Sequence, residues 1–250
     1  MSAHHLATSI VVLLGGGHAA GKRTAALSIR DQLHSTMQEF PIDVQIINMN
    51  EYTDHEKSSV DPSQFPSSKS AAITVKKEEK YKFPILKPSR FNFEKLKHDL
   101  RRLDQSSITQ KIVLVHGLYA LYDKELRDMA HIKVFIDSDA DTRLIRWIRR
   151  DVLEGKTENL ETVINAYLLG ARVEMSDYIF PTKEFCDVIM PKGPEPNSVS
   201  LVIDGILLYV SKNHQPQRTD LPSNYLRPSE IGNFEKERFD IQKNKFYQLN

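Results

Sequence analysis

A cluster of glycines near the N-terminus is the feature that most constrains how this chain folds. The 250 residues include only ten glycines, and four of them fall within seven positions: Gly15, Gly16, Gly17 and Gly21. Because glycine has no Cβ, such a cluster indicates a backbone that turns sharply or approaches a ligand closely. A β-branched run at residues 9–14 precedes the cluster, and apolar side chains at helical spacing follow it over residues 24–39. The sequence therefore predicts a buried strand, a tight loop and a helix, in that order.

The loop itself matches most of a phosphate-binding motif. Residues 16–22 read G-G-H-A-A-G-K and fit the pattern G-x-x-x-x-G-K. In such a loop the backbone N–H groups and the positive end of the helix surround a phosphate, and the lysine neutralises the β- and γ-phosphate charge. We expect the phosphates of a nucleotide to be bound here, by Gly16, Gly17, His18, Ala19, Ala20, Gly21, Lys22, Arg23 and Thr24.

The position after the lysine departs from this motif. A phosphate-binding loop has Ser or Thr there, because that hydroxyl ligates Mg²⁺. This chain has Arg23, a cation that cannot ligate a metal, and Thr24 follows one residue later. One residue along a helix turns a side chain by about 100°, so Thr24 is directed away from the metal position. The sequence therefore predicts phosphate binding but no metal ligand at this point, and Mg²⁺ is doubtful as a cofactor.

The remaining pattern predicts an α/β fold. Helical patterns alternate with short apolar runs that are typical of further strands, at residues 44–48, 111–115, 132–136 and 188–190. This alternation is typical of a doubly wound parallel sheet flanked by helices. We expect one domain over residues 9–211, in which the Ser-, Lys- and Glu-rich residues 53–82 form a mobile loop. A polar C-terminal extension is expected over residues 212–250.

The amino-acid composition limits which binding partners and which cellular compartment we expect for this protein. The chain has 34 Lys and Arg against 33 Asp and Glu, which argues against an overall basic surface that would bind nucleic acid or an anionic membrane but leaves a local basic patch open. The single cysteine, Cys186, excludes an internal disulfide framework. Residues 1–8 lack a basic segment, and the apolar run at residues 10–14 is shorter than a signal-peptide core. We expect a cytoplasmic protein, with the nucleus as an alternative.

Two segments in the C-terminal half carry a family resemblance. Residues 134–146 read V-F-I-D-S-D-A-D-T-R-L-I-R, and residues 180–193 read F-P-T-K-E-F-C-D-V-I-M-P-K-G. Together with the phosphate loop, the chain resembles the uridine/cytidine kinases, which are P-loop nucleoside kinases, and within them a divergent branch of fungal proteins. The resemblance implies a P-loop NTPase fold of the nucleoside-kinase type. It also implies transfer of the ATP γ-phosphoryl group to the 5′-hydroxyl of uridine or cytidine, a step of pyrimidine salvage.

The resemblance also shows which catalytic groups have been replaced. Asn50 stands where the family has its general base, an Asp, and an amide cannot take the hydroxyl proton. His116 stands where the family has a metal-binding Glu, and Leu86 stands where it has a ribose-binding Asp. The segment that recognises the base in the family has no counterpart between Leu103 and Lys111. These replacements put the family reaction in doubt.

The predicted lid helix over residues 140–153 matches the family in part. The resemblance assigns Arg143, Arg146 and Arg150 to family arginines that contact the moving phosphoryl group, whereas Trp147 replaces a substrate-contacting arginine. Lys22, Arg146 and Arg150 are therefore the expected catalytic residues.

Three functions remain open at this point. The chain could be a working nucleoside kinase in which His116 or Glu51 acts as the base. It could be a catalytically impaired pseudokinase that binds nucleotide or phosphate and acts as a regulatory module. It could also be a subunit that pairs with kinase-family members in a homo- or hetero-oligomer, because uridine kinases form oligomers.

Overall fold

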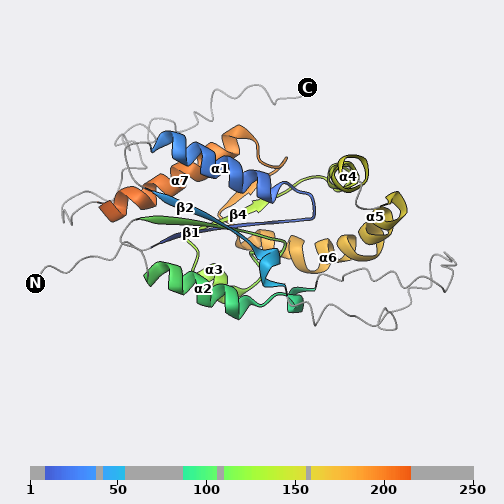
Figure 1. Ribbon diagram of the computed structural model, residues 1–250, viewed down its shortest axis with the longest axis horizontal. Helices are drawn as coiled ribbons and strands as arrows, with labels where there is room; N and C mark the ends of the chain where they lie inside the picture. The colour runs from blue at the N-terminus through green and yellow to red at the C-terminus, as the bar shows by residue number, and fades with distance from the viewer. Residues whose placement is uncertain (1–8, 38–41, 54–86, 106–109, 156–158, 215–250) are drawn as a thin grey trace, which may run out of the picture. The chain divides into compact units, whose positions relative to one another are not determined.

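A computed structural model describes residues 9–37, 42–53, 87–105, 110–155 and 159–214 (Figure 1). The predicted mobile loop, apart from Thr53, lies outside the described residues, as do Leu86 and residues 215–250 of the predicted extension. The described elements belong to one compact unit, Met1–Asn213.

A five-stranded sheet with the order β2-β3-β1-β4-β5 forms the centre of this unit. All of its pairings are parallel, which confirms the predicted parallel α/β fold. The strands are β1 (Ile10–Gly16), β2 (Asp43–Asn48), β3 (Lys111–His116), β4 (Ile132–Ile136) and β5 (Val188–Met190). Every residue of the central strand β1 is buried, because strands pair with it on both edges and helices cover both faces of the sheet.

Helices cover the two faces of the sheet in separate layers (Figure 1). One layer contains α1 (Lys22–Thr36) and α7 (Pro196–His214), and the other contains α2 (Phe93–Gln105) and α3 (Lys124–Asp128). Alternate residues of β1 serve the two cores: Val12 and Leu14 pack in the first, and Val11 and Leu13 in the second. This alternation follows from the period of two in a strand.

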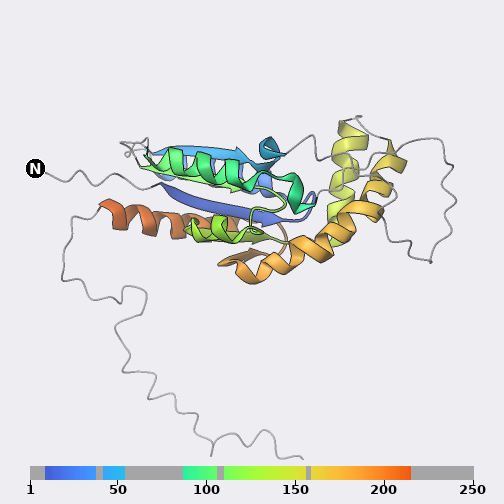
Figure 2. The ribbon, with the colours of Figure 1, turned by 90° about the horizontal axis from the view of Figure 1, so that it is seen from below.

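A further group of helical segments stands at the end of the sheet where the strands finish (Figure 2). We call this group the lid. It contains α4 (Ala140–Ile148), η5 (Arg149–Glu154), α5 (Leu160–Ala166), η6 (Tyr167–Ala171), α6 (Arg172–Glu174), η7 (Met175–Ile179) and η8 (Phe180–Phe185). Two short helices, η1 (Met49–Tyr52) and η4 (Pro88–Arg90), lie at the same end of the sheet.

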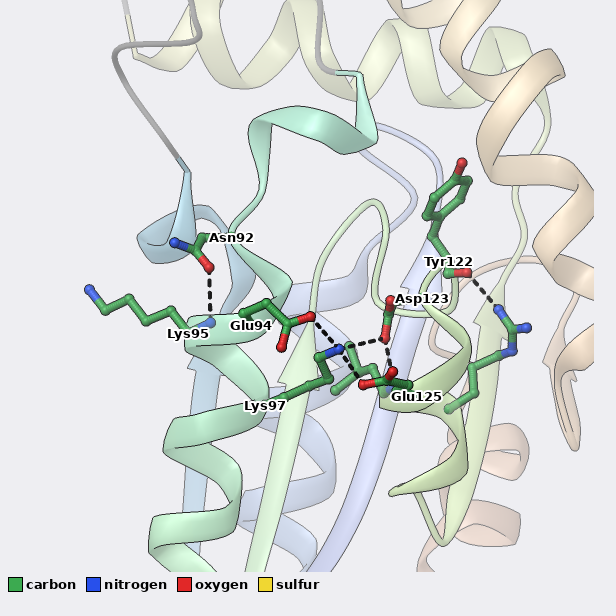
Figure 3. A network of polar contacts seen from close by, with 9 residues as sticks. Asn92, Glu94, Lys95, Lys97, Tyr122, Asp123 and Glu125 are labelled. Atoms are coloured by element: carbon green, nitrogen blue, oxygen red, sulfur yellow. Dashed lines mark hydrogen bonds and ion pairs between the residues drawn. The ribbon is translucent and has the colours of Figure 1, made fainter.

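A buried lysine joins α2 to α3 (Figure 3). Lys97 is only 1 % exposed, and its Nζ lies 2.6 Å from a carboxylate oxygen of Glu125 and 2.8 Å from one of Glu94. Asp123 lies 3.8 Å from the same nitrogen and caps α3 by accepting from the backbone N–H of Leu126. These hydrogen bonds raise the pKa of Lys97, so the ammonium group stays charged where it is buried.

No helix within the described residues is both long enough and apolar enough to cross a membrane.

Candidate phosphate-binding site

The glycine-rich loop connects the end of β1 to the start of α1, as predicted. Gly16 has φ 141°, and a Cβ on it would lie 2.3 Å from the carbonyl oxygen of Ile136 on the neighbouring strand. Gly21 caps α1 with φ 103°. Both positions therefore require glycine, because L side chains rarely adopt these conformations. The start of the loop packs against the backbone of β4 at Ile136. The loop ends at the N-terminus of α1, which is the positive end of the helix dipole.

Lys22 folds back over this loop. Its Nζ donates to the carbonyl oxygen of Gly16 at 3.0 Å and to that of Gly17 at 2.5 Å. Desolvation, aided by the charges of Arg143 and Arg150, lowers the pKa of Lys22 to about 7. A bound anion would reverse this effect, because it favours the charged form of the lysine.

Arg143 faces the loop from the lid. Its side chain is buried, and its Nε donates to the carbonyl oxygen of Ser138 at 3.0 Å. Its Nη1 is buried and has no hydrogen-bond partner among the residues that the structure describes, and a Cβ built on Gly17 would lie only 2.7 Å from that nitrogen. A buried donor with no partner costs on the order of 1–3 kcal/mol. An anion above Gly17 would remove that cost.

The two other predicted lid arginines also lie near the loop. Nη1 of Arg146 donates to Oγ of Ser138 at 3.3 Å and to the carbonyl oxygen of Ala20 at 3.5 Å. Arg150 is exposed and pairs with Asp151 through two hydrogen bonds. Its positive charge still contributes to the lowered pKa of Lys22. The lid therefore places the positive charges of its arginines near the glycine-rich loop that was predicted to bind phosphate.

Arg23 and His116 bring no oxygen ligand to the site. His116 ends β3 beside β1 and is only 7 % exposed. Desolvation lowers its pKa to about 4, helped by the charges of Lys22 and Arg23, so the imidazole is neutral near pH 7. Mg²⁺ prefers oxygen ligands, which neither a guanidinium nor an imidazole supplies. The residues at these two positions do not fit a magnesium ion.

Asn50 lies in η1, just beyond the end of β2. It is exposed, and its backbone N–H donates to Oδ1 of Asn48 at 3.1 Å. The neighbouring Glu51 is exposed as well. Among the residues that the structure describes, no group of three or more His, Cys, Asp or Glu side chains is arranged to hold a metal ion.

Glu174 is a residue of this site that the sequence did not indicate. It is buried in the lid, and its Oε2 lies 2.8 Å from Nε2 of His18 in the loop. The His18 ring also stacks on Trp147, with ring centroids 5.0 Å apart and the planes inclined by 10°. Because Glu174 and His18 are 156 residues apart, no local sequence signal could have paired them.

Comparison with known proteins identifies the family of this chain. The profile of the Phosphoribulokinase / Uridine kinase family matches residues 11–199. "Putative uridine kinase DAS2" of Saccharomyces cerevisiae is 29 % identical over 240 residues, covering 96 % of this chain and 95 % of that protein. A uridine kinase of Limosilactobacillus reuteri is 29 % identical over 210 residues, covering 77 % of this chain and 87 % of that enzyme.

A plant relative is longer than this chain. "Uridine kinase-like protein 3" of Arabidopsis thaliana is 27 % identical over 209 residues, which cover 78 % of this chain but only 42 % of that protein. The family profile covers the loop, the sheet and the lid, and the chain belongs to the phosphoribulokinase/uridine kinase family.

Proposed function

We propose that this protein binds ATP at the glycine-rich loop and transfers its γ-phosphoryl group poorly. The observation that carries the proposal is the uneven chemistry of the site. Lys22, Arg143 and Arg146 face the loop with cationic groups, whereas Asn50 and His116 stand where the family resemblance implies a general base and a metal ligand. The groups that bind phosphate are present, and the groups that would activate an acceptor hydroxyl are replaced.

The family reaction would need another base. A transfer to uridine or cytidine requires a group that takes the proton of the 5′-hydroxyl. An amide such as that of Asn50 does not accept it, and His116, with its pKa lowered to about 4, is a weak base. Loss of a general base costs roughly 10²–10⁴-fold in rate.

We also propose that ATP binding does not require a divalent cation. Arg23 and His116 offer no oxygen ligand for magnesium, but the loop, Lys22 and the lid arginines supply positive charge without it. A protein that holds a nucleotide without consuming it is suited to a regulatory or partner role beside kinase-family subunits. Native mass spectrometry of the chain alone, and mixed with such a subunit, would test for that association.

The first experiment measures ATP binding by calorimetry, with Mg²⁺ and with excess chelator. We expect similar affinities in the two conditions. Lys22→Ala should weaken binding by roughly 10–100-fold, the range expected for a hydrogen bond between charged groups. Lys95→Ala, which removes an exposed lysine of α2, serves as the matched control. Binding that occurs only with Mg²⁺ would contradict the proposal of cation-independent binding.

The second experiment measures phosphoryl transfer from ATP to uridine and to cytidine in a coupled assay. The rate should be at least about 100-fold below that of a bacterial uridine kinase assayed in parallel, because the general base is replaced. A comparable rate would show that the chain is a working kinase. His116→Ala and Glu51→Ala would then identify which side chain acts as the base.

A further inference from the structure

Three residues join the phosphate loop to the lid. We call His18, Glu174 and Trp147 the clasp. His18 belongs to the loop, Trp147 to α4, and Glu174 to α6. The imidazole is bonded at its edge to a carboxylate of which only 4 % is exposed, and one of its faces is stacked on the indole. The clasp therefore fixes both the position and the plane of one loop side chain from two separate helices.

The hydrogen bond of the clasp has a defined direction. A carboxylate only accepts, so Nε2 of His18 must carry the proton and donate it to Glu174. The charged groups that act on His18 are Glu174, Lys22 and Arg143. Burial, aided by the two cations, lowers the pKa of His18 although Glu174 opposes this effect, so the imidazole of the clasp is neutral at pH 7.

The clasp lies next to the groups that cover Gly17. Trp147 is four residues after Arg143, so the two side chains project from the same side of α4. Glu174 directly precedes Met175, whose sulfur would lie 2.9 Å from a Cβ on Gly17. The same Cβ would lie 2.7 Å from the unpartnered Nη1 of Arg143. Arg143 lies on α4 together with Trp147, and Met175 begins η7 directly after Glu174 of α6. The segments that hold His18 are therefore continuous with those that place Arg143 and Met175 over the loop.

We propose that Glu174 is a positioning residue of the phosphate site: through His18 it holds the lid against the loop so that Nη1 of Arg143 faces the bound phosphate. This inference rests on the proposed binding of phosphate by the loop. Glu174 itself does not touch the ligand and acts through Arg143. A carboxylate near an anion site could instead weaken binding by charge repulsion, and the two effects have opposite signs.

Calorimetry with pyrophosphate and with ATP separates these effects. Glu174→Ala should weaken pyrophosphate binding by roughly 10-fold or more, because a charge-assisted contact from Arg143 is misplaced. Glu174→Gln keeps an oxygen that accepts from His18, and it should restore most of the lost affinity. His18→Ser, which breaks the clasp from the loop side, should cause a loss similar to that of Glu174→Ala. Val173→Ala, an exposed neighbour, is the matched control.

Two further measurements distinguish positioning from a general loss of structure. Trp147 is the only tryptophan in the chain, so its fluorescence reports on the clasp alone. Its emission should shift in Glu174→Ala and in His18→Ser, and return toward the wild-type value in Glu174→Gln. Because Glu174 acts through Arg143, the double variant Glu174→Ala/Arg143→Met should bind no more weakly than Arg143→Met alone.

Each outcome bears on the proposal. Tighter binding by Glu174→Gln than by wild type would mean that the carboxylate repels phosphate, which overturns the positioning role. Unchanged affinity in Glu174→Ala and His18→Ser, with wild type binding normally, would overturn the inference and leave the proposed function intact. No binding of pyrophosphate or ATP by wild type would overturn both.

Discussion

At the scale of single residues, the proposed phosphate site contains a lysine whose pKa is lowered. Lys22 lies against two carbonyl oxygens of its own loop, and its pKa is lowered to about 7 by desolvation and by the nearby charges of Arg143 and Arg150. The lysine exists near neutral pH as a mixture of ammonium and amine. Only the ammonium form attracts a phosphate, so we expect phosphate binding at the proposed site to respond to pH in a range where most lysines do not.

ATP affinity should fall as the pH is raised from 7 to 9. Well below pH 7 Lys22 is protonated in the free protein, so binding takes up no proton there. Above pH 7 the free lysine loses its proton, and binding must take one up because the phosphate raises the pKa of Lys22. The affinity should then fall by up to about tenfold per pH unit. Calorimetry in buffers of different ionisation enthalpy measures the proton uptake, and Lys22→Ala should abolish it. Equal affinities at pH 7 and pH 9 would refute the prediction.

At the scale of elements, α3 is held by charges rather than by its own length. It has only five residues, too few for a stable isolated helix. Asp123 caps its first turn, and Glu125 binds the buried ammonium group of Lys97 on α2 (Figure 3). The hydrogen bond from Lys97 is the main cause of the lowered pKa of Glu125. The short helix is thus fixed to its neighbour by an ion pair whose lysine is buried and whose carboxylate is exposed.

Lys97→Met should raise the pKa of Glu125 toward its ordinary value. Methionine has a similar length but donates no hydrogen bond, so the carboxylate loses the group that favours its charged form. The titration of the Glu125 side-chain carbon by NMR measures this change. Lys95→Met, two residues earlier and exposed, should leave the pKa of Glu125 as it is in wild type. An unchanged pKa in Lys97→Met would show that the contact does not persist in solution.

At the scale of the whole molecule, the strand order assembles the site. β1 lies between β3 and β4, and the register pairs Leu14 with His116 and Gly16 with Ile136. The phosphate loop, the end of β3 and the start of the lid therefore meet where the parallel strands finish. Ligands of open α/β sheets bind at this edge, where neighbouring connections diverge to opposite faces.

Because the loop connects the central strand to α1 and contacts the lid through His18, ATP should stabilise the entire folded unit. At an ATP concentration of 100 times the dissociation constant, the free energy of unfolding should rise by about 2.7 kcal/mol. For a domain of this size, that corresponds to an increase in Tm of roughly 5–10 °C. Thermal unfolding followed by circular dichroism, with ATP and with adenosine as the control without phosphates, measures the shift. A Tm that does not respond to ATP would argue against binding at the loop.

The sequence by itself determined the local features. Gly16, Gly21 and Lys22 were recognised because a tight turn and a phosphate contact require particular residue types at neighbouring positions. The strands were recognised because β-branched runs are local signals, and family resemblance located Arg143 and Arg146 in the lid. The parallel sheet followed from the alternation of strands and helices.

Only the tertiary structure decided which distant residues act together. His18 and Glu174 are 156 residues apart, and the sequence around neither residue indicates that the two side chains are in contact. The unpartnered Nη1 of Arg143 and the lowered pKa of Lys22 likewise depend on burial by segments far along the chain. Burial and the distances between side chains are set by the packing of the whole chain, whereas a sequence pattern depends only on residues that are close together in the sequence. The loop could therefore be predicted from the sequence, whereas the clasp formed by His18, Glu174 and Trp147 could not.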